Sequence, residues 1–384
     1  MAVRYRSARG VSQLARRANI AVVFDLSPSV PAVVLFAVGW MAGWVMLARP
    51  RPLPRSSAAH QAKPGTRVPL AVVIPARNEA ANIGGLVSAL SLQLSSGDQL
   101  MVVDDRSTDD TAAIARSAGA EVFRAPSLPA GWVGKPHACH TGVTRTSAPM
   151  LVFVDADVTP AADLLDRLAV IVDRDPDGLV SVQPHHVAVK AAEQLSLVGN
   201  IVALMGAAAF TAFGDRPAPR MAFGPVLACR RTAYLAAGGH AHPDVRAQLT
   251  EDLALARRFD HRQLFTGRPD TTFRMYPDGG LGDVIAGWTR NIASGAGATP
   301  AWASVLVFAW VWSLCGGWVA SPWFAAASMV QLAVLGRRAG RFAWWMVVAY
   351  PVAAAFFVAV VIRSTIARGG RRSVTWKGRR VTVR

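Results

Sequence analysis

The sequence predicts an α/β domain with flanking transmembrane helices. Between residues 70 and 183, short apolar runs alternate with polar loops and helix-like segments, and this rhythm predicts parallel strands covered by helices. Two of the predicted strands end in acidic residues, at Asp104-Asp105 and at Asp155-Ala156-Asp157. Outside this region the chain has long uncharged runs, and its composition is 52% hydrophobic with 12 Trp, which is typical of a membrane protein.

Five strands are expected in the α/β region. Ser107, with Asp110 three residues later, resembles a capping box for a helix over 108–118, and Gly119 is the expected end of that helix. A second helix is expected over 249–258. The strands are predicted at 70–74, 100–103, 121–123, 150–154 and 179–183.

Three uncharged runs predict membrane segments. Residues 30–48 and 342–362 are each long enough, at about 1.5 Å per residue, to cross most of a ~30 Å hydrocarbon core. The run 30–48 exceeds the roughly 7 to 15 residues of a signal-peptide core and lacks a clean cleavage pattern, so an anchor is favoured over a secretory signal. Residues 301–336 are interrupted at Ser321-Pro322. We expect one bent span there, and a hairpin is the alternative.

Charge and cysteine content exclude several classes of protein. The net charge of +17 is concentrated beside the apolar runs, in 1–17, 49–67 and 363–384, which fits anionic lipid headgroups better than nucleic acid. We therefore expect no nucleic-acid partner. The three cysteines are far apart in the sequence, which argues against a disulfide framework or a structural zinc site. They are Cys139, Cys229 and Cys315.

Motif searches remove two further classes. No Gly-x-Gly-x-x-Gly follows the first predicted strand, and Gly134-Lys135-Pro136 is not a Walker loop. The sequence therefore gives no motif support for a dinucleotide oxidoreductase or a P-loop ATPase.

Residues 190–213 are apolar again, and an interfacial helix and a buried helix both fit them.

The acidic strand ends predict a site for a metal and a nucleotide. Ligands of open α/β sheets bind beyond the carboxyl ends of the strands, and closely spaced carboxylates there can hold Mg²⁺ or Mn²⁺ against a diphosphate. An Asp-x-Asp triplet is common by chance. This triplet is more informative because it follows a predicted strand and because an earlier strand also ends in acids. The histidine pairs His137/His140 and His185/His186 are expected in loops and the acceptor pocket, because such a metal prefers oxygen ligands.

Four ordered motifs carry a family resemblance. They are Pro75-Ala76-Arg77-Asn78-Glu79, Asp104-Asp105-x-Ser107-Thr108-Asp109, Asp155-Ala156-Asp157 and Thr250-Glu251-Asp252. In this order they resemble the signature of inverting family 2 glycosyltransferases, which have a GT-A fold. Further stretches are similar to membrane-bound diaponeurosporenoate glycosyltransferases of staphyloxanthin-type carotenoid synthesis. These stretches are 131–139, 181–186, 223–226, 238–240, 273–276, 287–291 and 376–379.

The resemblance implies a donor side. The donor would be a nucleotide-diphospho-sugar, expected to be a UDP-sugar, and Asp157, helped by Asp155, would hold Mg²⁺ or Mn²⁺ on its diphosphate, where the metal acts as a Lewis acid. Lys135 would steady the diphosphate, although a solvated lysine fits the sequence equally well. The remaining donor-binding residues would be Pro75, Arg77, Glu79, Asp104 and Asp105.

The resemblance also implies an acceptor side. Inversion needs one carboxylate base, and Asp252 is the candidate, although an acid in the first turn of a helix also fits simple compensation of the helix dipole. A carboxylate acceptor is already ionised near neutral pH and needs no base, so Glu251-Asp252 favours a hydroxyl acceptor or an orienting role. The residues expected at the acceptor or in closure of the site are Gly224, Glu251, Trp288 and Arg290.

The resemblance implies that the protein transfers a sugar, with inversion, to a membrane-embedded terpenoid lipid such as a carotenoid acid. The alternatives are another family 2 transferase, acting on a hopanoid, glycerolipid, polyprenyl phosphate or polysaccharide, and a non-catalytic relative, which the retained carboxylates disfavour. Processive relatives carry Gln-x-x-Arg-Trp, and the order of Trp288 and Arg290 differs.

Because nucleotide sugars are cytosolic, we expect a multi-pass cell-membrane protein with a cytoplasmic catalytic domain. The expected divisions are a basic segment (1–29), a transmembrane anchor (30–48), a linker (49–67), a GT-A glycosyltransferase domain (68–299), a transmembrane region (300–362) and a basic tail (363–384).

Overall fold

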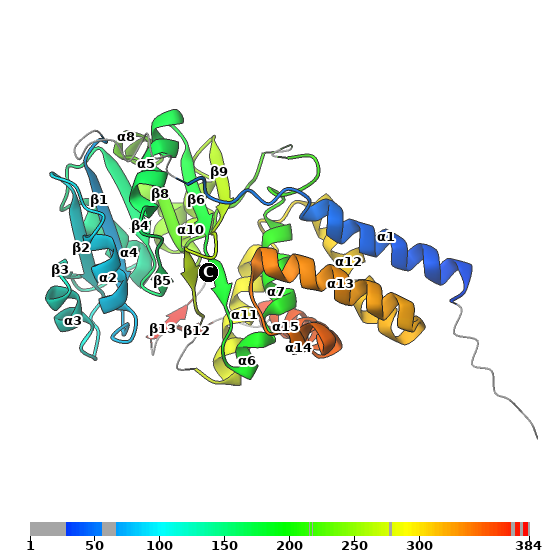
Figure 1. The fold of residues 1–384 in the computed structure, drawn as a ribbon. Helices are drawn as coiled ribbons and strands as arrows, with labels where there is room; N and C mark the ends of the chain where they lie inside the picture. Colours follow the sequence, from blue (N-terminus) through cyan, green and yellow to red (C-terminus); the bar gives the residue numbers. More distant parts are fainter. Residues whose placement is uncertain are drawn as a thin grey trace, which may run out of the picture.

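A computed structural model describes residues 28–55, 67–214, 216, 218–275, 279–369, 373–376 and 379–382. An α/β domain occupies one end of the molecule, and long helices project from the other (Figure 1). Most of the expected basic N-terminal segment lies outside the described residues, as do Tyr276 and Lys377-Gly378 from two of the motifs.

Seven strands form the main sheet, in the order β3-β2-β1-β4-β8-β6-β9. Residues 70–74 of β1 are all buried, as expected of a parallel strand covered on both faces. The expectation of a parallel sheet needs one correction, because β8 runs antiparallel between β4 and β6. The strands are β1 (Leu70–Ala76), β2 (Gln99–Asp104), β3 (Glu121–Arg124), β4 (Met150–Val154), β6 (Leu179–Gln183), β8 (Val226–Arg230) and β9 (Arg262–Thr266).

Helices cover both faces of this sheet. One face packs against α2 (Ile83–Ser91), α3 (Thr111–Ser117) and α5 (Leu164–Arg174). The other packs against α4 (Gly134–Val143), α8 (Arg231–Ala236), α9 (Pro243–Arg246) and α10 (Glu251–Ala256), with the 3-10 turn η1 (Gly239–Ala241) between α8 and α9. Helix α3 begins three residues later than predicted and ends at Ser117. Gly119, the predicted stop, lies two residues beyond and has a φ of 105°.

A second sheet links the α/β domain to the long helices. Its strands are very short and lie in the order β11-β7-β10-β5. Strand β5 (Val158–Thr159) follows Asp157 directly, and β11 (Gly340–Arg341) follows the last residue of a long helix. Between them lie β7 (His185–Val187) and β10 (Thr272–Phe273). Near the C-terminus, β12 (Ser373–Trp376) and β13 (Arg379–Thr382) form an antiparallel pair.

Three long helices pack side by side at the other end of the molecule, namely α1 (Val30–Met46), α12 (Ala301–Ala320) and α13 (Pro322–Ala339) (Figure 1). We expected one bent span over 301–336, and this was wrong, because α13 folds back along α12. Gln331 of α13 accepts a hydrogen bond from the Trp310 indole of α12 at 2.8 Å and donates to the Trp40 carbonyl of α1 at 2.6 Å. The chain reverses at Ser321, whose backbone is extended and whose hydroxyl accepts from Trp323 N.

Close helix packing in this bundle depends on two glycines of α1. A Cβ atom on Gly39 would lie 2.3 Å from the Ala309 carbonyl oxygen, and one on Gly43 would lie 2.5 Å from the Trp310 ring. Small residues four positions apart allow helix backbones to approach closely, as they do in membranes.

The remaining helices join the bundle to the α/β domain. Helix α7 (Leu197–Gly206) is largely buried and shares a core with α1, α12 and α13, which favours the buried alternative for residues 190–213. Around it lie α6 (Ala191–Gln194), α11 (Leu281–Gly295), α14 (Trp344–Val348) and α15 (Tyr350–Gly369).

Within the described part of the chain, two helices are long and apolar enough to cross a membrane by length and composition, α12 and the Tyr350–Ala367 part of α15. Most of the exposed large apolar side chains belong to the helices outside the α/β domain, including Leu35 of α1, Phe308 and Trp312 of α12 and Trp323 of α13. So many exposed large apolar side chains on neighbouring helices are unusual for a soluble protein.

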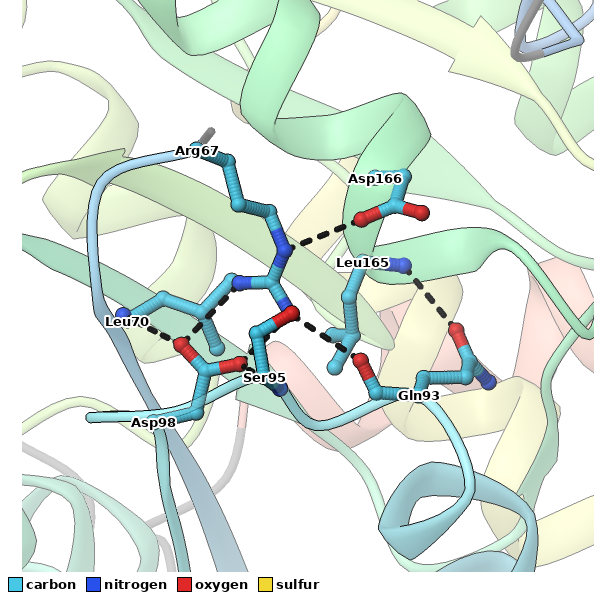
Figure 2. Close-up of polar contacts among 7 residues, drawn as sticks. All are labelled: Arg67, Leu70, Gln93, Ser95, Asp98, Leu165 and Asp166. Carbon is cyan, nitrogen blue, oxygen red and sulfur yellow. Dashed lines mark hydrogen bonds and ion pairs between the residues drawn. The ribbon is translucent and has the colours of Figure 1, made fainter. Parts of the chain in front are cut away.

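Arg67 has a structural role that the sequence analysis did not predict. Its guanidinium pairs with Asp98 at 2.5 Å and Asp166 at 2.9 Å, and it donates to the Gln93 carbonyl (Figure 2). Asp98 in turn accepts from the backbone N–H of Leu70. This cluster fixes the start of β1, so Arg67 is not one of the basic groups that flank the first apolar run.

The described part of the expected linker also contacts the sheet. Leu53 is fully buried and donates its backbone N–H to the Thr266 carbonyl, while Thr266 N–H donates to the Arg51 carbonyl. Residues 51–53 therefore run along β9.

Candidate active site

The loops after β1 and β2 are joined to one another. Asn78, with a φ of 53°, accepts from Thr108 N–H through its side chain, and its own N–H donates to the Ser107 hydroxyl. Ser107 therefore bonds across to the neighbouring loop and is not the N-cap of α3, as its predicted role required. The N–H of Ser107 donates to Asp104 at 3.0 Å.

The predicted donor residues Arg77 and Asp105 meet in the same place. Arg77 donates to the Asp105 carbonyl at 2.6 Å, and its guanidinium lies 3.9 Å from the Asp105 carboxylate. Glu79 follows in the same loop, where its N–H donates to the Thr111 hydroxyl. Pro75 lies in β1, paired with Val103 of β2. The carboxyl ends of two parallel strands thus bring the predicted donor residues together.

Lys135 connects the acids after β4 with those of α10. Its ammonium lies 2.7 Å from Asp155 Oδ1 and 2.8 Å from Glu251 Oε1. The Glu251 side chain is only 3% exposed, whereas those of Lys135 and Asp155 are 23% and 27% exposed. Burial raises the pKa of Glu251 to about 7 despite the attraction of Lys135.

Gly224 and Asp252 lie in contact. A Cβ atom on Gly224 would stand 2.7 Å from Asp252 Oδ2, so only glycine leaves room for this carboxylate. The next residue, Pro225, accepts a hydrogen bond from Asp155 N–H at 2.9 Å. The Asp252 carboxylate therefore lies beside the loop that holds Asp155. Burial raises the pKa of Asp252, while Lys135 acts in the opposite direction.

The acids after β4 suit a divalent cation. Burial and then the charges of Asp155 and Glu79 raise the pKa of Asp157 to about 7, so added positive charge would relieve this cluster. The described residues contain no group of three or more His, Cys, Asp or Glu side chains able to hold a metal by themselves. Mg²⁺ is commonly bound through one or two carboxylates plus substrate phosphates, and Asp155 and Asp157 would be the carboxylates here.

The predicted closure residues lie on α11. Trp288 is buried, donates its indole N–H to the Ser196 hydroxyl at 2.9 Å, and packs its ring against Gly199 of α7. Its contacts are those of a residue that joins α11 to α7. Arg290 lies two residues further along the same helix, and its closing role stays a prediction.

A row of buried polar residues at α6 and α7 escaped the sequence analysis. Glu193 pairs with Arg274 at 2.8 Å, the Gln194 side chain accepts from Ala343 N–H, and the Asn200 amide contacts His186 Nδ1. These bonds join α6 and α7 to β7, to the loop after β10 and to the segment after β11. The available signal was the presence of four polar residues, Glu193, Gln194, Ser196 and Asn200, within an otherwise apolar run.

Sequence comparison agrees with this geometry. The model of the family described as Glycosyl transferase family 2 matches residues 71–196. The 4,4'-diaponeurosporenoate glycosyltransferase of Staphylococcus aureus (strain USA300) is 32% identical over 337 residues, which cover 82% of this chain and 88% of that protein. The chain belongs to glycosyltransferase family 2. The S. aureus protein from strain MRSA252 is 31% identical over the same shares of both chains.

Solved structures similar to this glycosyltransferase include two enzymes. A mannosyltransferase from Pyrobaculum calidifontis in complex with GDP-Man and Mn²⁺ is 19% identical, with a TM-score of 0.49, and the match covers 87% of this chain and 97% of that one. Glucosyl-3-phosphoglycerate synthase from Mycobacterium tuberculosis, in complex with Mn²⁺, UDP and glucosyl-3-phosphoglycerate, is 23% identical, with a TM-score of 0.43, over 65% and 87%.

The family assignment confirms that the protein is a glycosyltransferase, and the mixed α/β sheet confirms the predicted GT-A fold.

Proposed function

We propose that this glycosyltransferase moves a sugar, with inversion, from a nucleotide-diphospho-sugar to a membrane-embedded terpenoid lipid such as a carotenoid acid. The observation that carries the proposal is the group of Lys135, Asp155, Glu251 and Asp252 beside the carboxyl end of β4. The similarity to 4,4'-diaponeurosporenoate glycosyltransferase over most of both chains supports the class of acceptor.

Donor binding is assigned to the loops after β1, β2 and β4. Asp155 and Asp157 would hold Mg²⁺ or Mn²⁺ together with diphosphate oxygens, and the bound cation would stabilise the leaving nucleoside diphosphate as a Lewis acid. Hydrogen bonds join the loop that carries Arg77 to the segment that carries Asp104 and Asp105. These residues would contact the nucleoside, which is expected to be uridine. Pro75 and Glu79 lie in the same part of the proposed nucleoside site.

Asp252 is assigned as the general base. Its carboxylate is held against Gly224, and its raised pKa brings it closer to the working pH, where a carboxylate base is most effective. Asp252 would take the proton of an acceptor hydroxyl while the bond to the sugar forms on the face opposite the leaving diphosphate.

The same observation favours a second candidate acceptor. A carotenoid acid is already ionised near neutral pH and gives Asp252 no proton to remove. A terpenoid or other lipid with a hydroxyl group, such as a hopanoid, would need Asp252 to remove its proton. Glycerolipids, polyprenyl phosphates and polysaccharides are the remaining alternatives within the family.

We place the protein in the cell membrane with α1, α12 and α13 spanning it and the catalytic domain in the cytoplasm, where nucleotide sugars are found. Helix α15 is also long and apolar enough to cross, but it packs against α11 and α7, so we do not assign the span predicted at 342–362 as a crossing. Arg49 follows α1, and Arg337, Arg338 and Arg341 lie at the domain end of α13, which fits the positive-inside rule. Helix α14 is too short to cross, and it returns the chain beside α13 before α15 packs along α11. This arrangement keeps the C-terminal tail on the domain side.

Two experiments test the proposal. Purified protein mixed with UDP-glucose, Mn²⁺ and host lipid extract should release free UDP only when both the metal and the lipid are present. Intact-lipid mass spectrometry of the host, with and without the gene, should show one glycosylated terpenoid lipid that disappears on deletion. Loss of a glycosylated glycerolipid or polysaccharide instead would refute the terpenoid assignment.

A further inference from the structure

Lys135 joins the two halves of the proposed active site. Asp155 belongs to the metal side, because it follows β4, and Glu251 belongs to the acceptor side, because it begins α10. The ammonium contacts both carboxylates at normal ion-pair distances, 2.7 Å and 2.8 Å. One oxygen of a proposed metal ligand, Asp155 Oδ1, is therefore in contact with the Lys135 ammonium.

The surroundings of Lys135 also suit an anion. Lys135 is the second residue of α4, a helix of 10 residues with no side-chain cap at its N-terminus. The first backbone N–H groups of a helix lack partners within it, and they carry partial positive charge. Pro136 has no N–H, and the Val133 N–H donates to the Arg246 carbonyl. An incoming diphosphate would therefore meet the N–H groups of Gly134 and Lys135 and the partly exposed Lys135 side chain.

Glu251 contacts Lys135 and is almost inaccessible to an acceptor. Its side chain is 3% exposed, and the contact with Lys135 occupies Oε1. The predicted role of Glu251 at the acceptor is therefore less suitable than a role in positioning Lys135.

We propose that Lys135 competes with the divalent cation for Asp155 in the donor-free enzyme and moves to the donor diphosphate when cation and donor bind, while Glu251 keeps its ammonium within reach. This inference rests on the proposed function. Two positive charges at one carboxylate oxygen repel each other, whereas a diphosphate brings negative charge that accepts a lysine. Lys135 thereby delays full metal binding until the nucleotide is present.

The test measures binding to the purified full-length protein, without catalysis. Mn²⁺ affinity is measured by electron paramagnetic resonance in the absence of nucleotide, and UDP affinity is measured by calorimetry at saturating Mn²⁺. The variants are Lys135→Met and the double variant Lys135→Met/Glu251→Gln. The double variant leaves the net charge unchanged and removes the buried Glu251 carboxylate together with its lysine partner, so a change in net charge does not account for its behaviour.

Both variants should bind Mn²⁺ roughly tenfold more tightly than wild type, because the Asp155 oxygen is released. Both should bind UDP roughly tenfold more weakly at saturating Mn²⁺, because the diphosphate loses its lysine. Arg230→Met is the matched control, since it removes an ion pair with Asp173 at the opposite end of β4. It should change neither affinity.

Each contrary result has a distinct meaning. Unchanged or weaker Mn²⁺ affinity in the double variant overturns the competition, and unchanged UDP affinity in Lys135→Met overturns the movement to the diphosphate. Failure of the wild-type protein to bind UDP in a Mn²⁺-dependent way overturns the proposed donor site and this inference with it.

Discussion

Gly224→Ala offers a direct test of the position of Asp252. The new Cβ atom would lie 2.7 Å from Asp252 Oδ2 and 3.0 Å from its Cγ, whereas ordinary contacts begin at 3.4 Å. The carboxylate must therefore retreat by about 0.7 Å. Misplacement of a catalytic group by about 1 Å can cost on the order of 10²-fold in rate, so we expect transfer to slow by roughly tenfold to a hundredfold.

The assay is single-turnover transfer to the lipid acceptor with the donor prebound. Donor affinity, measured by calorimetry with Mn²⁺, should stay near the wild-type value, because Asp252 is assigned to the acceptor and not to the nucleotide. Gly85→Ala in α2 is the control, since a Cβ atom there meets nothing within 4 Å. It should leave both measurements unchanged.

Two results would refute this reasoning. A rate within twofold of wild type would mean that the position of Asp252 is irrelevant to transfer. An equal loss of donor affinity would mean that the change reaches Asp155 through Pro225, whose carbonyl accepts the Asp155 N–H. The Gly224 loop would then belong to the donor site.

Three further substitutions have defined outcomes. Asp157→Asn should abolish Mn²⁺-dependent UDP binding. In the wild-type protein, Mn²⁺ affinity should fall about tenfold per pH unit below pH 7, because the pKa of Asp157 is raised to about 7 and the metal must displace its proton. Asp252→Asn should slow transfer to a hydroxyl acceptor by ~10² to 10⁴, and by roughly tenfold or less with a carboxylate acceptor, with donor affinity unchanged in both cases. Asp98→Ala should destabilise the fold by about 3 kcal/mol, seen as a lower thermal midpoint, because Arg67, only 11% exposed, loses a partner that is itself 1% exposed.

Each of these predictions can fail in its own way. Metal-dependent UDP binding that survives in Asp157→Asn would remove this residue from the metal site, and a pH-independent Mn²⁺ affinity would contradict its raised pKa. Lost donor affinity in Asp252→Asn would exclude the base role. An unchanged midpoint in Asp98→Ala would mean that Asp166 alone suffices to hold Arg67.

The strands were predictable because their signal is local. The runs predicted at 150–154 and 179–183 coincide with β4 and β6, since continuous apolar segments bounded by turn residues define buried strands. The direction of β8 was not predictable, because an apolar run carries no information about which neighbour it pairs with. The predicted start of α3 was wrong for a related reason, because the Ser107 hydroxyl bonds to Asn78 in another loop and does not cap the helix.

In the long helices and in the active site as well, local features were predictable from the sequence and long-range contacts were not. The uncharged run 301–336 and its break at Ser321-Pro322 fit a bend and a hairpin equally, and the hairpin depends on contacts such as that between Gln331 and Trp310. The acids at strand ends were predictable from topology. The pairing of Lys135 with Glu251 was not, because it requires α4 and α10 to pack on the same face of the sheet.

In the membrane arrangement that we propose, the second sheet would fix the distance of the active site from the bilayer. Its first strand starts at the residue after Asp157, and its last strand starts at the residue after α13. Hydrogen-bonded ladders, rather than a flexible tether, therefore connect the proposed metal site to a proposed membrane helix. If the acceptor is a membrane lipid, as we propose, two acceptors with the same reacting group should react at different rates when their polar ends project to different distances from the membrane.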